Sequence, residues 1–501
     1  MNSRRVLNLA AAIGLAALTL PAVSVSAPEK SAETEAVQVL AQGPVHEAYA
    51  QPVNTQADAA TIVTKPPPDA IEELPPDQRP EGDRVQWIPG YWAWDADQGD
   101  YLWVSGSWRM PPPGRRWLPG HWQEVDTGWV WVAGFWAPGK VNELQYLPPP
   151  PPTLDDGPSA PAPDESSTYV AGCWVHQETR FLWRPGHWIA YAPGWVWTPA
   201  CYIWTPSGCL FNDGYWDHPL DERGLLFAPV RFGKAWWSDR RAFTPQYVIH
   251  QDFLLGALFV GPARQHYYFG DYFEPAYEKR GFVAWTDDRK GRNTYDPMFG
   301  YYHHQHAADP SWERGLRELY RARQSGDVPR PPRTLLLQIE AVKKLADAKT
   351  TDVVVHKNIN LTHVQNVVVL APLKEIHNTK VTNLGSLHEK GSTVPDRVLK
   401  LEPVSKEEHA REQKAAAQLA EAARLRHEAE LRLLHEGGTP LRHTDPPKAL
   451  KLELPKPLPV VNTSPPLRKE PPPAPIVPKH EDKPIPKYEP PKPLGPPKRH
   501  D

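Results

Sequence analysis

Cysteine is scarce in this sequence, and its scarcity limits what disulfides could do. Only three cysteines, Cys173, Cys201 and Cys209, occur among 501 residues, and an odd count allows at most one disulfide within the chain. Cys201 and Cys209 flank an apparent turn at 205–208, so a bridge across a hairpin is one possibility. Three free thiols are the alternative that the sequence leaves open.

Long apolar runs are also missing. Beyond the first thirty residues the longest apolar run is 253–261, which is too short to cross a bilayer as a helix and is predicted to be a buried strand or turn. The stretch 6–23 is short for a membrane span, and no stop-transfer pattern follows it. We therefore expect a water-soluble or peripherally attached mature chain without a transmembrane span.

The sequence has little excess charge of either sign. Its formal net charge is −3 and its pI is about 6.7. A nucleic-acid-binding protein would concentrate Lys and Arg on one face, and no such concentration occurs in the part predicted to fold. The charge pattern therefore predicts no nucleic-acid partner.

Recognisable metal and cofactor motifs are absent. The only clustered metal-ligand residues are His303, His304 and His306 in the segment YYHHQH. Neighbouring histidines point in different directions, and no Cys/His companion pair has the spacing of a zinc site. We interpret them as exposed histidines at the edge of an aromatic core, with no metal and no cofactor.

Catalytic motifs are missing as well. The chain has no G-x-S-x-G elbow and no glycine-rich phosphate loop. Carboxylates such as Asp239, Asp271 and Glu274 are available, but a glycosidase needs two of them at a defined separation in a cleft. The sequence predicts a protein that is not an enzyme, and an unrecognised hydrolase remains the last alternative.

The N-terminus has the features of an export signal. Arg4 and Arg5 precede the apolar stretch 6–23, and small residues before Ala27 offer a cleavage site. We expect cleavage after Ala27, with an uncleaved anchor as the alternative. The two arginines also loosely resemble a twin-arginine signal.

Proline and tryptophan are abundant, with 61 and 21 residues respectively. The tryptophans form a six-residue repeat, Trp-x-x-Gly-x-Trp, whose copies begin at residues 87, 103, 117, 131, 169, 183, 197 and 211. Within each series of four copies the starts lie 14 to 16 residues apart. The last two copies are degenerate, because Ala200 replaces the glycine of one and Phe211 replaces the first tryptophan of the other.

A period of 14 residues suits one strand and one turn. We therefore predict a mainly β fold: an antiparallel meander or sandwich-like repeat domain of 14-residue units, arranged as two four-strand meanders, with C-terminal α-helices and long disordered proline-rich segments. Residues five apart on a regular strand face opposite sides. A bulge at the glycine would return both tryptophans to one face, and the glycine would supply the unusual backbone angles that a bulge needs. We prefer this bulged strand over a tight turn at Pro-Gly.

Beyond the repeats, helices are predicted at 312–324 and 335–348. Ser405 and Glu408 form a capping box for a third helix. We expect this third helix to be either solvated or part of a weak coiled coil. The predicted segments are a signal peptide (1–27), a disordered tether (28–83), repeats one to four (84–147), a proline-rich linker (148–166), repeats five to eight with an aromatic β segment (167–305), helices and an extended Val- and Asn-rich stretch (306–403), an Ala- and charge-rich helix (404–437) and a basic proline-rich disordered tail (438–501).

The tryptophans allow two interpretations. They could form the core, since each ring buries about 150–250 Å², or some could form an exposed platform that stacks on sugars or proline-rich peptides. The residues predicted for such a platform are the second aromatic residues of seven repeats, Trp92, Trp108, Trp122, Trp136, Trp174, Trp188 and Trp216.

The repeat resembles that of the exported bacterial WXXGXW (YXWGXW) repeat proteins, and the longer run 45–333 is similar to their planctomycete-type members. The resemblance implies export and a repeat architecture, and it implies no particular activity, ligand or catalytic residue. We predict an exported, non-enzymatic scaffold or interaction protein of the cell envelope, whose partners are envelope polysaccharide or other envelope proteins. A carbohydrate-binding module that uses exposed tryptophan faces is the alternative.

Overall fold

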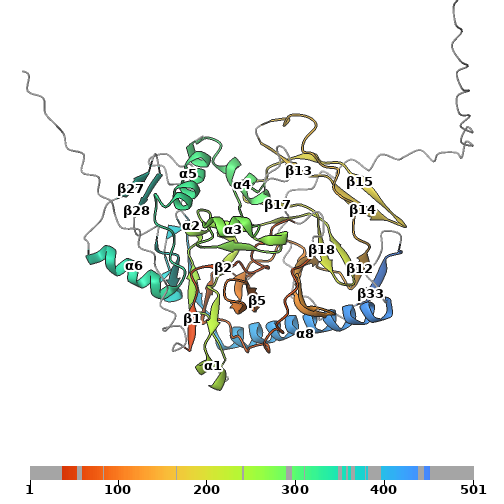
Figure 1. The fold of residues 1–501 in the computed structure, drawn as a ribbon, viewed down its shortest axis with the longest axis horizontal. Coiled ribbons are helices and arrows are strands. Elements are labelled where there is room, and N and C mark those ends of the chain that lie inside the picture. Colours follow the sequence, from red (N-terminus) through yellow and green to blue (C-terminus); the bar gives the residue numbers. More distant parts are fainter. Residues whose placement is uncertain are drawn as a thin grey trace, which may run out of the picture.

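The structure is a computed structural model, and it describes residues 36–53, 59–82, 84–164, 166–239, 242–288, 296–309, 311–347, 353–356, 359–362, 367–378, 380–381, 397–437 and 445–451. The predicted signal peptide and residues 452–501 of the predicted tail lie outside these ranges. Within them, no helix combines the length and apolar character that a membrane span requires. The fold is mainly antiparallel β with C-terminal helices, which confirms the predicted class (Figure 1).

Each pair of consecutive repeats forms one antiparallel hairpin whose two strands are both interrupted in the middle. The first hairpin consists of β4 (Gln86–Ile88), β5 (Tyr91–Asp95), β6 (Asp100–Val104) and β7 (Ser107–Arg109). The second consists of β8 (Arg115–Leu118), β9 (His121–Val125), β10 (Gly128–Val132) and β11 (Phe135–Pro138). The third consists of β13 (Ser167–Val170), β14 (Cys173–Gln177), β15 (Arg180–Arg184) and β16 (His187–Ala190). The fourth consists of β17 (Val196–Thr198), β18 (Cys201–Thr205), β19 (Gly208–Asn212) and β20 (Tyr215–Asp217).

The register of every hairpin places the first aromatic residue of one repeat opposite the second aromatic residue of its partner. The facing pairs are Trp87–Trp108, Trp92–Trp103, Trp117–Trp136, Trp122–Trp131, Tyr169–Trp188, Trp174–Trp183, Trp197–Trp216 and Tyr202–Phe211. Ring centroids within these pairs lie 5.0–5.6 Å apart, mostly edge to face. Such pairs contribute roughly 0.5–1.5 kcal/mol each beyond the area that they bury.

The repeat glycine is required by close approach, and the prediction that it supplies unusual backbone angles is wrong. None of the repeat glycines has a positive φ. A Cβ added to Gly106 would lie 2.5 Å from both Cζ2 of Trp87 and the carbonyl oxygen of Ile88. The same Cζ2 contact of 2.5 Å, made by the first tryptophan of the partner repeat, recurs at Gly120, Gly134, Gly172 and Gly214.

The interruption at the glycine divides each hairpin between two ladders. In the first hairpin, β5 and β6 continue into β22 (Val230–Phe232) and β1 (Val37–Val39), whereas β4 and β7 continue into β21 (Gly224–Leu226). Each repeat therefore forms an interrupted strand, and the alternative of a tight turn at Pro-Gly is not what the structure has. Other outer strands are added by β12 (Glu143–Leu147) and β33 (Lys448–Lys451), which extend the β18–β19 ladder.

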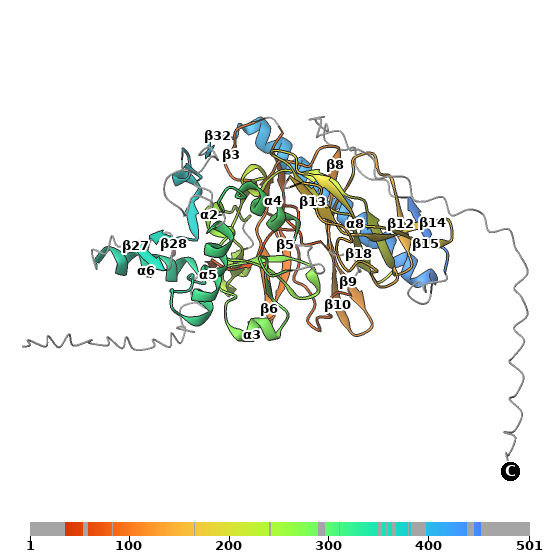
Figure 2. The ribbon, with the colours of Figure 1, turned by 90° about the horizontal axis from the view of Figure 1, so that it is seen from above.

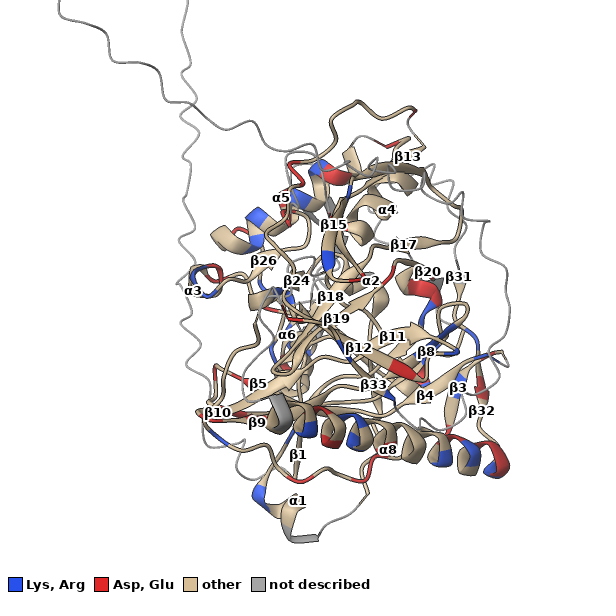
Figure 3. Ribbon diagram, turned by 90° about the vertical axis from the view of Figure 1, so that its right-hand side faces the viewer, with Lys and Arg blue, Asp and Glu red and all other residues tan. Residues whose placement is uncertain are grey.

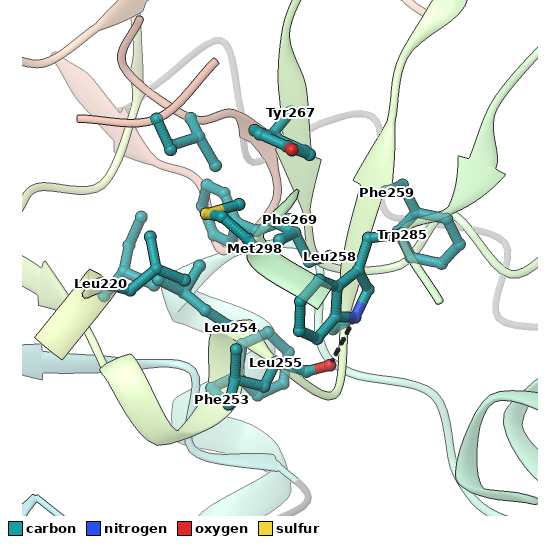
Figure 4. Packing of buried hydrophobic residues seen from close by; sticks show 14 of the residues in the cluster. Leu220, Phe253, Leu254, Leu255, Leu258, Phe259, Tyr267, Phe269, Trp285 and Met298 are labelled. Carbon is teal, nitrogen blue, oxygen red and sulfur yellow. Dashed lines mark hydrogen bonds between the residues drawn. The ribbon is translucent and has the colours of Figure 1, made fainter. Parts of the chain in front are cut away.

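The largest apolar cluster of the described residues lies mainly in the segment after the fourth hairpin, and it also includes residues from 41–50 and Val196 of β17. It gathers β24 (Leu258–Val260), β25 (Tyr267–Phe269), β26 (Val283–Ala284) and β2 (Gly43–Pro44) with short helices around them. Trp285 is fully buried at its centre and donates its indole N–H to the carbonyl oxygen of Leu255 at 2.9 Å (Figure 4). The run 253–261, predicted as a strand or turn, is divided between a short helix and β24.

Three of the described helices were predicted from the sequence. The described helices are α1 (Lys234–Asp239), α2 (Gln251–Leu254), α3 (Pro275–Lys279), α4 (Pro297–Gln305), α5 (Ser311–Ser325), α6 (Leu335–Asp347) and α8 (Lys406–Gly437). The helices predicted at 312–324 and 335–348 correspond to α5 and α6. The capping box of α8 is formed as predicted, since Ser405 Oγ accepts from Glu408 N at 3.2 Å and Glu408 accepts from Ser405 N at 3.0 Å. The YYHHQH segment lies in and just after α4, which was not predicted.

Short strands complete the described fold. They are β3 (Gln78–Pro80), β23 (Tyr247–Ile249), β27 (Val353–His356), β28 (Ile359–Thr362), β29 (Leu370–Pro372), β30 (Lys380–Val381), β31 (Arg397–Val398) and β32 (Leu401–Pro403). The pairing of β3 with β32 joins the region before the repeats to the start of α8.

Residues 36–53 and 59–82 are packed into the folded body, so the predicted tether at 28–83 is wrong for these ranges. Val45, Ala48 and Tyr49 are buried, and Tyr49 donates its hydroxyl proton to the carbonyl oxygen of Leu220 at 2.7 Å. The composition predicted a segment unable to bury enough apolar surface. It did not reveal that the repeats need polar groups from this segment.

The long helix α8 lies along the outside of the first two hairpins, rather than being solvated on all sides or paired in a coiled coil (Figures 1 and 2). Ala415, Ala422 and Ala429, seven residues apart, are buried on the face toward the hairpins. Because alanine is small, the helix approaches closely. Lys, Arg, Asp and Glu residues occur along its length (Figure 3).

Candidate functional site

The main candidate site is a cavity of about 660 Å³ between the third hairpin, the fourth hairpin and α4. Its walls come from β13, β16, β17, β20, α4 and the start of α5. Figure 1 labels β13, β17, α4 and α5 in this region. Asp164, His303 and Ala307 border the cavity and are exposed. The cavity is therefore open to solvent, and its volume suits a small-molecule ligand.

Aromatic rings are prominent in the lining. The tyrosines and tryptophans are Tyr169, Trp188, Tyr191, Trp197, Trp216, Tyr301 and Trp312. Trp188, Trp197 and Trp216 are half-buried, whereas Trp87 and Trp108 at the corresponding positions of the first hairpin are fully buried. The second series of repeats therefore leaves part of its ring surface available at the cavity.

The three histidines of YYHHQH border the cavity but take three different partners. His303 Nε2 lies 3.0 Å from a carboxylate oxygen of Glu313, and the His304 ring stacks on Tyr191 with centroids 4.0 Å apart. The ring of His306 stacks on Trp312 at 4.6 Å. Burial lowers the pKa of His306 to about 4, so its imidazole is neutral at physiological pH.

The described part of the chain has no cluster of side chains arranged as metal ligands. There, no group of three or more His, Cys, Asp or Glu side chains is placed to hold an ion. The stacking of His304 and His306 on aromatic rings agrees with a place at the edge of an aromatic core. The prediction that the histidines are exposed holds for His303 and is wrong for His306, which is buried.

Carboxylates border the cavity, and each has a role in the surrounding structure. Asp296 caps α4 by accepting from Met298 N at 3.0 Å, and Asp309 accepts from Ser311 N at 3.0 Å at the start of α5. Glu313 pairs with Arg317 at 2.7 Å. Asp164 accepts from the hydroxyl groups of Ser166 and Ser167, which lower the pKa of Asp164.

The carboxylates proposed for a hydrolase lie elsewhere. Asp271 and Glu274 both pair with Arg333, at 2.8 and 2.5 Å, and Asp239 is the last residue of α1. Asp271 and Glu274 do not border the cavity.

The predicted tryptophan platform is divided by the structure. Trp92, Trp108 and Trp136 are buried, while Trp122, Trp174, Trp188 and Trp216 are half-buried. Only Trp188 and Trp216 border the cavity.

The sequence interpretation missed Trp197, Tyr191, Tyr301 and Trp312 as lining residues. The degenerate seventh repeat, which begins at Trp197, was a signal that this part of the chain differs. No sequence signal places α4 beside the repeats.

A second polar cluster occurs at the interruptions of the hairpins, where backbone groups lose their ladder partners. Glu73 accepts from Gly90 N at 2.6 Å, from Gly106 N at 3.0 Å and from Trp103 Nε1 at 2.9 Å. It therefore satisfies both interruptions of the first hairpin and one of its first-position tryptophans. We call such an arrangement a carboxylate clamp.

Carboxylate clamps also occur in the second and third hairpins. Glu47 accepts from Gly134 N at 2.9 Å and from Trp131 Nε1 at 2.6 Å. Asp155 accepts from Gly172 N, and from the hydroxyl of Tyr169 at 3.0 Å. Tyr169 stands in the first-tryptophan position, so its hydroxyl replaces the indole N–H as a donor to the clamp.

Other backbone groups at and near the interruptions also find partners outside the hairpins. Arg426 of α8 donates to Pro119 O at 3.2 Å and to Ala133 O at 3.0 Å. Glu412 of α8 accepts from Trp87 N at 3.0 Å. Buried backbone groups require partners, so the interrupted repeat depends on segments remote in sequence.

The clamp glutamate Glu73 is unusual in its ionisation. Burial raises the pKa of Glu73 to about 7, although hydrogen bonds from Gly106, Trp103 and Gly90 act in the opposite direction. No Lys or Arg of the described residues is seen to pair with it. We regard the clamps as structural, because they are enclosed within the hairpins.

The cysteines do not form the predicted bridge. In the β18–β19 ladder Cys201 faces Asn212 and Cys209 faces Trp204, three rungs apart. Three rungs separate the two by roughly 10 Å, which is beyond the reach of a disulfide. All three cysteines lie in the described part of the chain, and none is joined in a disulfide.

Comparison with known proteins is consistent with this hairpin architecture. No curated protein and no solved structure matches the chain. A family model described as "WXXGXW repeat (2 copies)" matches residues 87–109, 116–137, 168–188 and 193–217. Each match coincides with one interrupted hairpin, so the two-copy unit of the family model is the structural unit, and the chain carries four WXXGXW repeat units of this kind.

Proposed function

We propose that this chain is a non-enzymatic binding protein of the cell envelope, and that it holds a saccharide in the aromatic cavity. The observation that carries the proposal is the set of half-buried tryptophans, Trp188, Trp197 and Trp216, around a cavity of about 660 Å³. The C–H faces of a sugar ring pack on such aromatic surfaces, and the carboxylates and histidines nearby offer hydrogen bonds to hydroxyl groups.

The non-enzymatic part of the proposal is supported by the roles of the bordering carboxylates. A glycosidase needs one carboxyl group to deliver a proton and a second to act as base or nucleophile. Here Asp296 and Asp309 accept bonds at helix starts, and Glu313 is paired with Arg317. These contacts give each carboxylate a part in holding the surrounding structure, which suits binding better than proton transfer.

Export is part of the same proposal and rests on the N-terminal sequence pattern of residues 1–27. Envelope polysaccharide is the ligand class that this location would offer. N-terminal sequencing of the protein recovered from the envelope fraction should begin at residue 28, and recovery of an intact N-terminus from the cytoplasm would contradict export.

The binding test uses the full chain, because Glu47, Glu73 and α8 all stabilise the hairpins from outside residues 84–305. Titration with envelope polysaccharide fragments, followed by tryptophan fluorescence and calorimetry, should give saturable binding. The substitution Trp188→Ala should abolish it.

Trp174→Ala is the matched control for Trp188→Ala. Both tryptophans belong to the third hairpin, are half-buried and face an aromatic partner. Each donates its indole N–H to a carbonyl of the proline-rich segment, at Pro152 for Trp174 and Ala160 for Trp188. Trp174 does not border the cavity, so equal loss of binding in both variants would contradict the proposed site.

A scaffold role is the second candidate, favoured by the packing of α8 against the hairpins and by the pairing of β33 with β12. The basic, proline-rich residues that follow β33 would then engage envelope polymers or other envelope proteins. Removal of 452–501, which keeps β33 in place, should release the protein from the envelope fraction without lowering its melting temperature. Unchanged retention would argue against this role.

A further inference from the structure

We propose that the aromatic cavity recognises a ligand that carries a positively charged ammonium group, such as a sugar with a free amine. This inference rests on the proposed function, since it names the chemistry of the ligand that the same site would hold. It follows from the charges around the cavity, the aromatic surfaces inside it and a polar atom at its edge.

The charges around the cavity are acidic. Among the described residues that line it are Asp164, Asp296, Asp309 and Glu313, and none of the lining residues is Lys or Arg. Asp164 comes from the proline-rich segment and Glu313 from α5, so carboxylates enter the lining from separate elements. An anionic ligand would meet carboxylates with no lysine or arginine in the lining to offset them.

Asp164 is the carboxylate best placed to meet a ligand from solvent. It is exposed, and its hydrogen-bond donors, the backbone N–H of Ser166 and the hydroxyl groups of Ser166 and Ser167, are uncharged. Those donors lower the pKa of Asp164 and keep it ionised. Its negative charge is therefore present at the entrance of the cavity.

The aromatic rings add a second source of attraction. The faces of tryptophan and tyrosine rings carry partial negative charge and attract ammonium groups, most strongly where water is excluded. Trp188, Trp197 and Trp216 combine exposed ring surface with this property. Aromatic faces with carboxylates and without lysine or arginine form a chemical environment that favours cations over neutral or anionic groups.

His306 provides an independent observation that points to a ligand. Its side chain is 6% exposed and borders the cavity, and its Nε2 has no hydrogen-bond partner among the described residues. Burial keeps the imidazole neutral by lowering the pKa of His306. A neutral imidazole nitrogen can accept a hydrogen bond from an ammonium N–H and adds no positive charge to the site.

The experiment compares two ligands that differ only in the acetylation of their amino groups, which removes the positive charge. Glucosamine oligomers and fully N-acetylated glucosamine oligomers of equal length are titrated into the full chain, at a pH where the free amine is protonated. We expect the charged oligomer to bind at least tenfold more tightly, with an affinity that falls as salt is added. Competition by choline would show that a quaternary ammonium also fits, whereas competition by methylammonium alone would assign the site to primary amines.

Two outcomes separate this inference from the proposed function. Equal or tighter binding of the N-acetylated oligomer would overturn the ammonium inference and leave saccharide binding intact. Failure of both oligomers and of all neutral envelope saccharides to bind would overturn both proposals.

A charge variant tests the same point within the protein. Asp164→Asn should weaken binding of the charged oligomer by about three- to fivefold, the range typical of one exposed ion pair, and leave any binding of the neutral oligomer unchanged. Asp156→Asn is the matched control, since Asp156 is exposed on the same segment and does not border the cavity. Equal effects of the two substitutions, or no effect of either, would contradict a role for Asp164 in ammonium binding.

Discussion

At the scale of the residue, the repeat motif is explained by what each position touches. The first tryptophan covers the glycine of the partner repeat, the glycine leaves room for that ring, and the second tryptophan meets the first edge to face. The glycine N–H then needs an acceptor, which a clamp carboxylate supplies. The spacing that recurs in every copy of the motif therefore follows from packing across a hairpin rather than from a property of a single strand.

Gly106→Ala tests this close contact. The added methyl group would lie 2.5 Å from Trp87 Cζ2 and from the carbonyl oxygen of Ile88, both buried, so we expect a loss of about 2–4 kcal/mol in unfolding free energy. Chemical denaturation measures it. Gly99→Ala is the control, because Gly99 has a φ of 59° and no neighbour within 4 Å, and it should lose only about 1–2 kcal/mol. Comparable losses would contradict the close-contact explanation.

Glu73 gives a prediction about pH. Its pKa is raised from 4.5 to about 7 in the folded protein, so the folded state holds a proton that the unfolded state releases between these values. The contribution of Glu73 to stability is therefore fully present below about pH 4.5 and is lost as the pH rises through 7, by about 3 kcal/mol in total. Denaturation between pH 5 and 8 should show this slope.

Substitution at Glu73 separates its charge from its hydrogen bonds. Glu73→Gln should remove the pH slope and also destabilise the protein by about 1–3 kcal/mol at pH 5, because its amide N–H₂ would face the glycine N–H groups. Glu72→Gln is the control, since Glu72 is adjacent and exposed. A pH slope that survives in Glu73→Gln would assign it to another group.

At the scale of the element, α8 shows how a helix with little apolar surface can still be part of a fold. Its buried face consists of alanines together with Glu412, Arg426 and Glu430. Arg426 and Glu430 pair at 2.8 Å, and Tyr146 donates to Glu430 at 2.7 Å. The helix therefore binds the hairpins through close alanine contacts and through polar groups that satisfy the interrupted strands.

Ala422→Leu tests the alanine face. Ala422 is 3% exposed, so a larger side chain should separate α8 from the hairpins and lower the unfolding free energy by about 1–3 kcal/mol. Ala420→Leu, on the exposed side of the same helix, should change it by less than about 0.5 kcal/mol. Equal stability of the two variants in thermal denaturation would show that α8 is not packed as described.

At the scale of the whole molecule, segments far apart in the sequence complete one another. The second hairpin receives Glu47 from before the repeats and Arg426 from 293 residues after Ala133, and β3 pairs with β32. The repeat units are therefore not independent, in contrast to repeat proteins whose units contact only their neighbours.

Truncation tests this dependence. A chain ending at residue 404 lacks α8 and β33, which leaves the backbone carbonyls of Pro119 and Ala133 without their arginine partner. We expect it to melt at least 10 °C lower than the full chain or to aggregate, given the several buried groups exposed. A chain ending at residue 451 should melt as the full chain does. Equal melting of the shorter chain would contradict a structural role for α8.

Much of the secondary structure could be predicted from local patterns. The eight repeat copies, the hairpin turns and the capping box at Ser405 are signals within a few residues of one another, and the structure contains the corresponding elements. The cavity could be predicted only in part. Trp188 and Trp216 were singled out by the repeat, whereas Tyr301 and Trp312 reach the cavity through α4 and α5, whose position depends on the core around Trp285.

The sequence by itself determined the repeat, its antiparallel β character and the boundaries of the long helices, because these depend on spacing and capping within short windows. Only the tertiary structure decided that residues 36–53 and 59–82 of the apparent tether are folded and that α8 is packed. The physical reason is that the interrupted strands bury backbone groups without ladder partners, and these groups take partners from wherever the chain returns. Burial of the first series of tryptophans and partial exposure of the second depend on the same packing, and that difference creates the cavity.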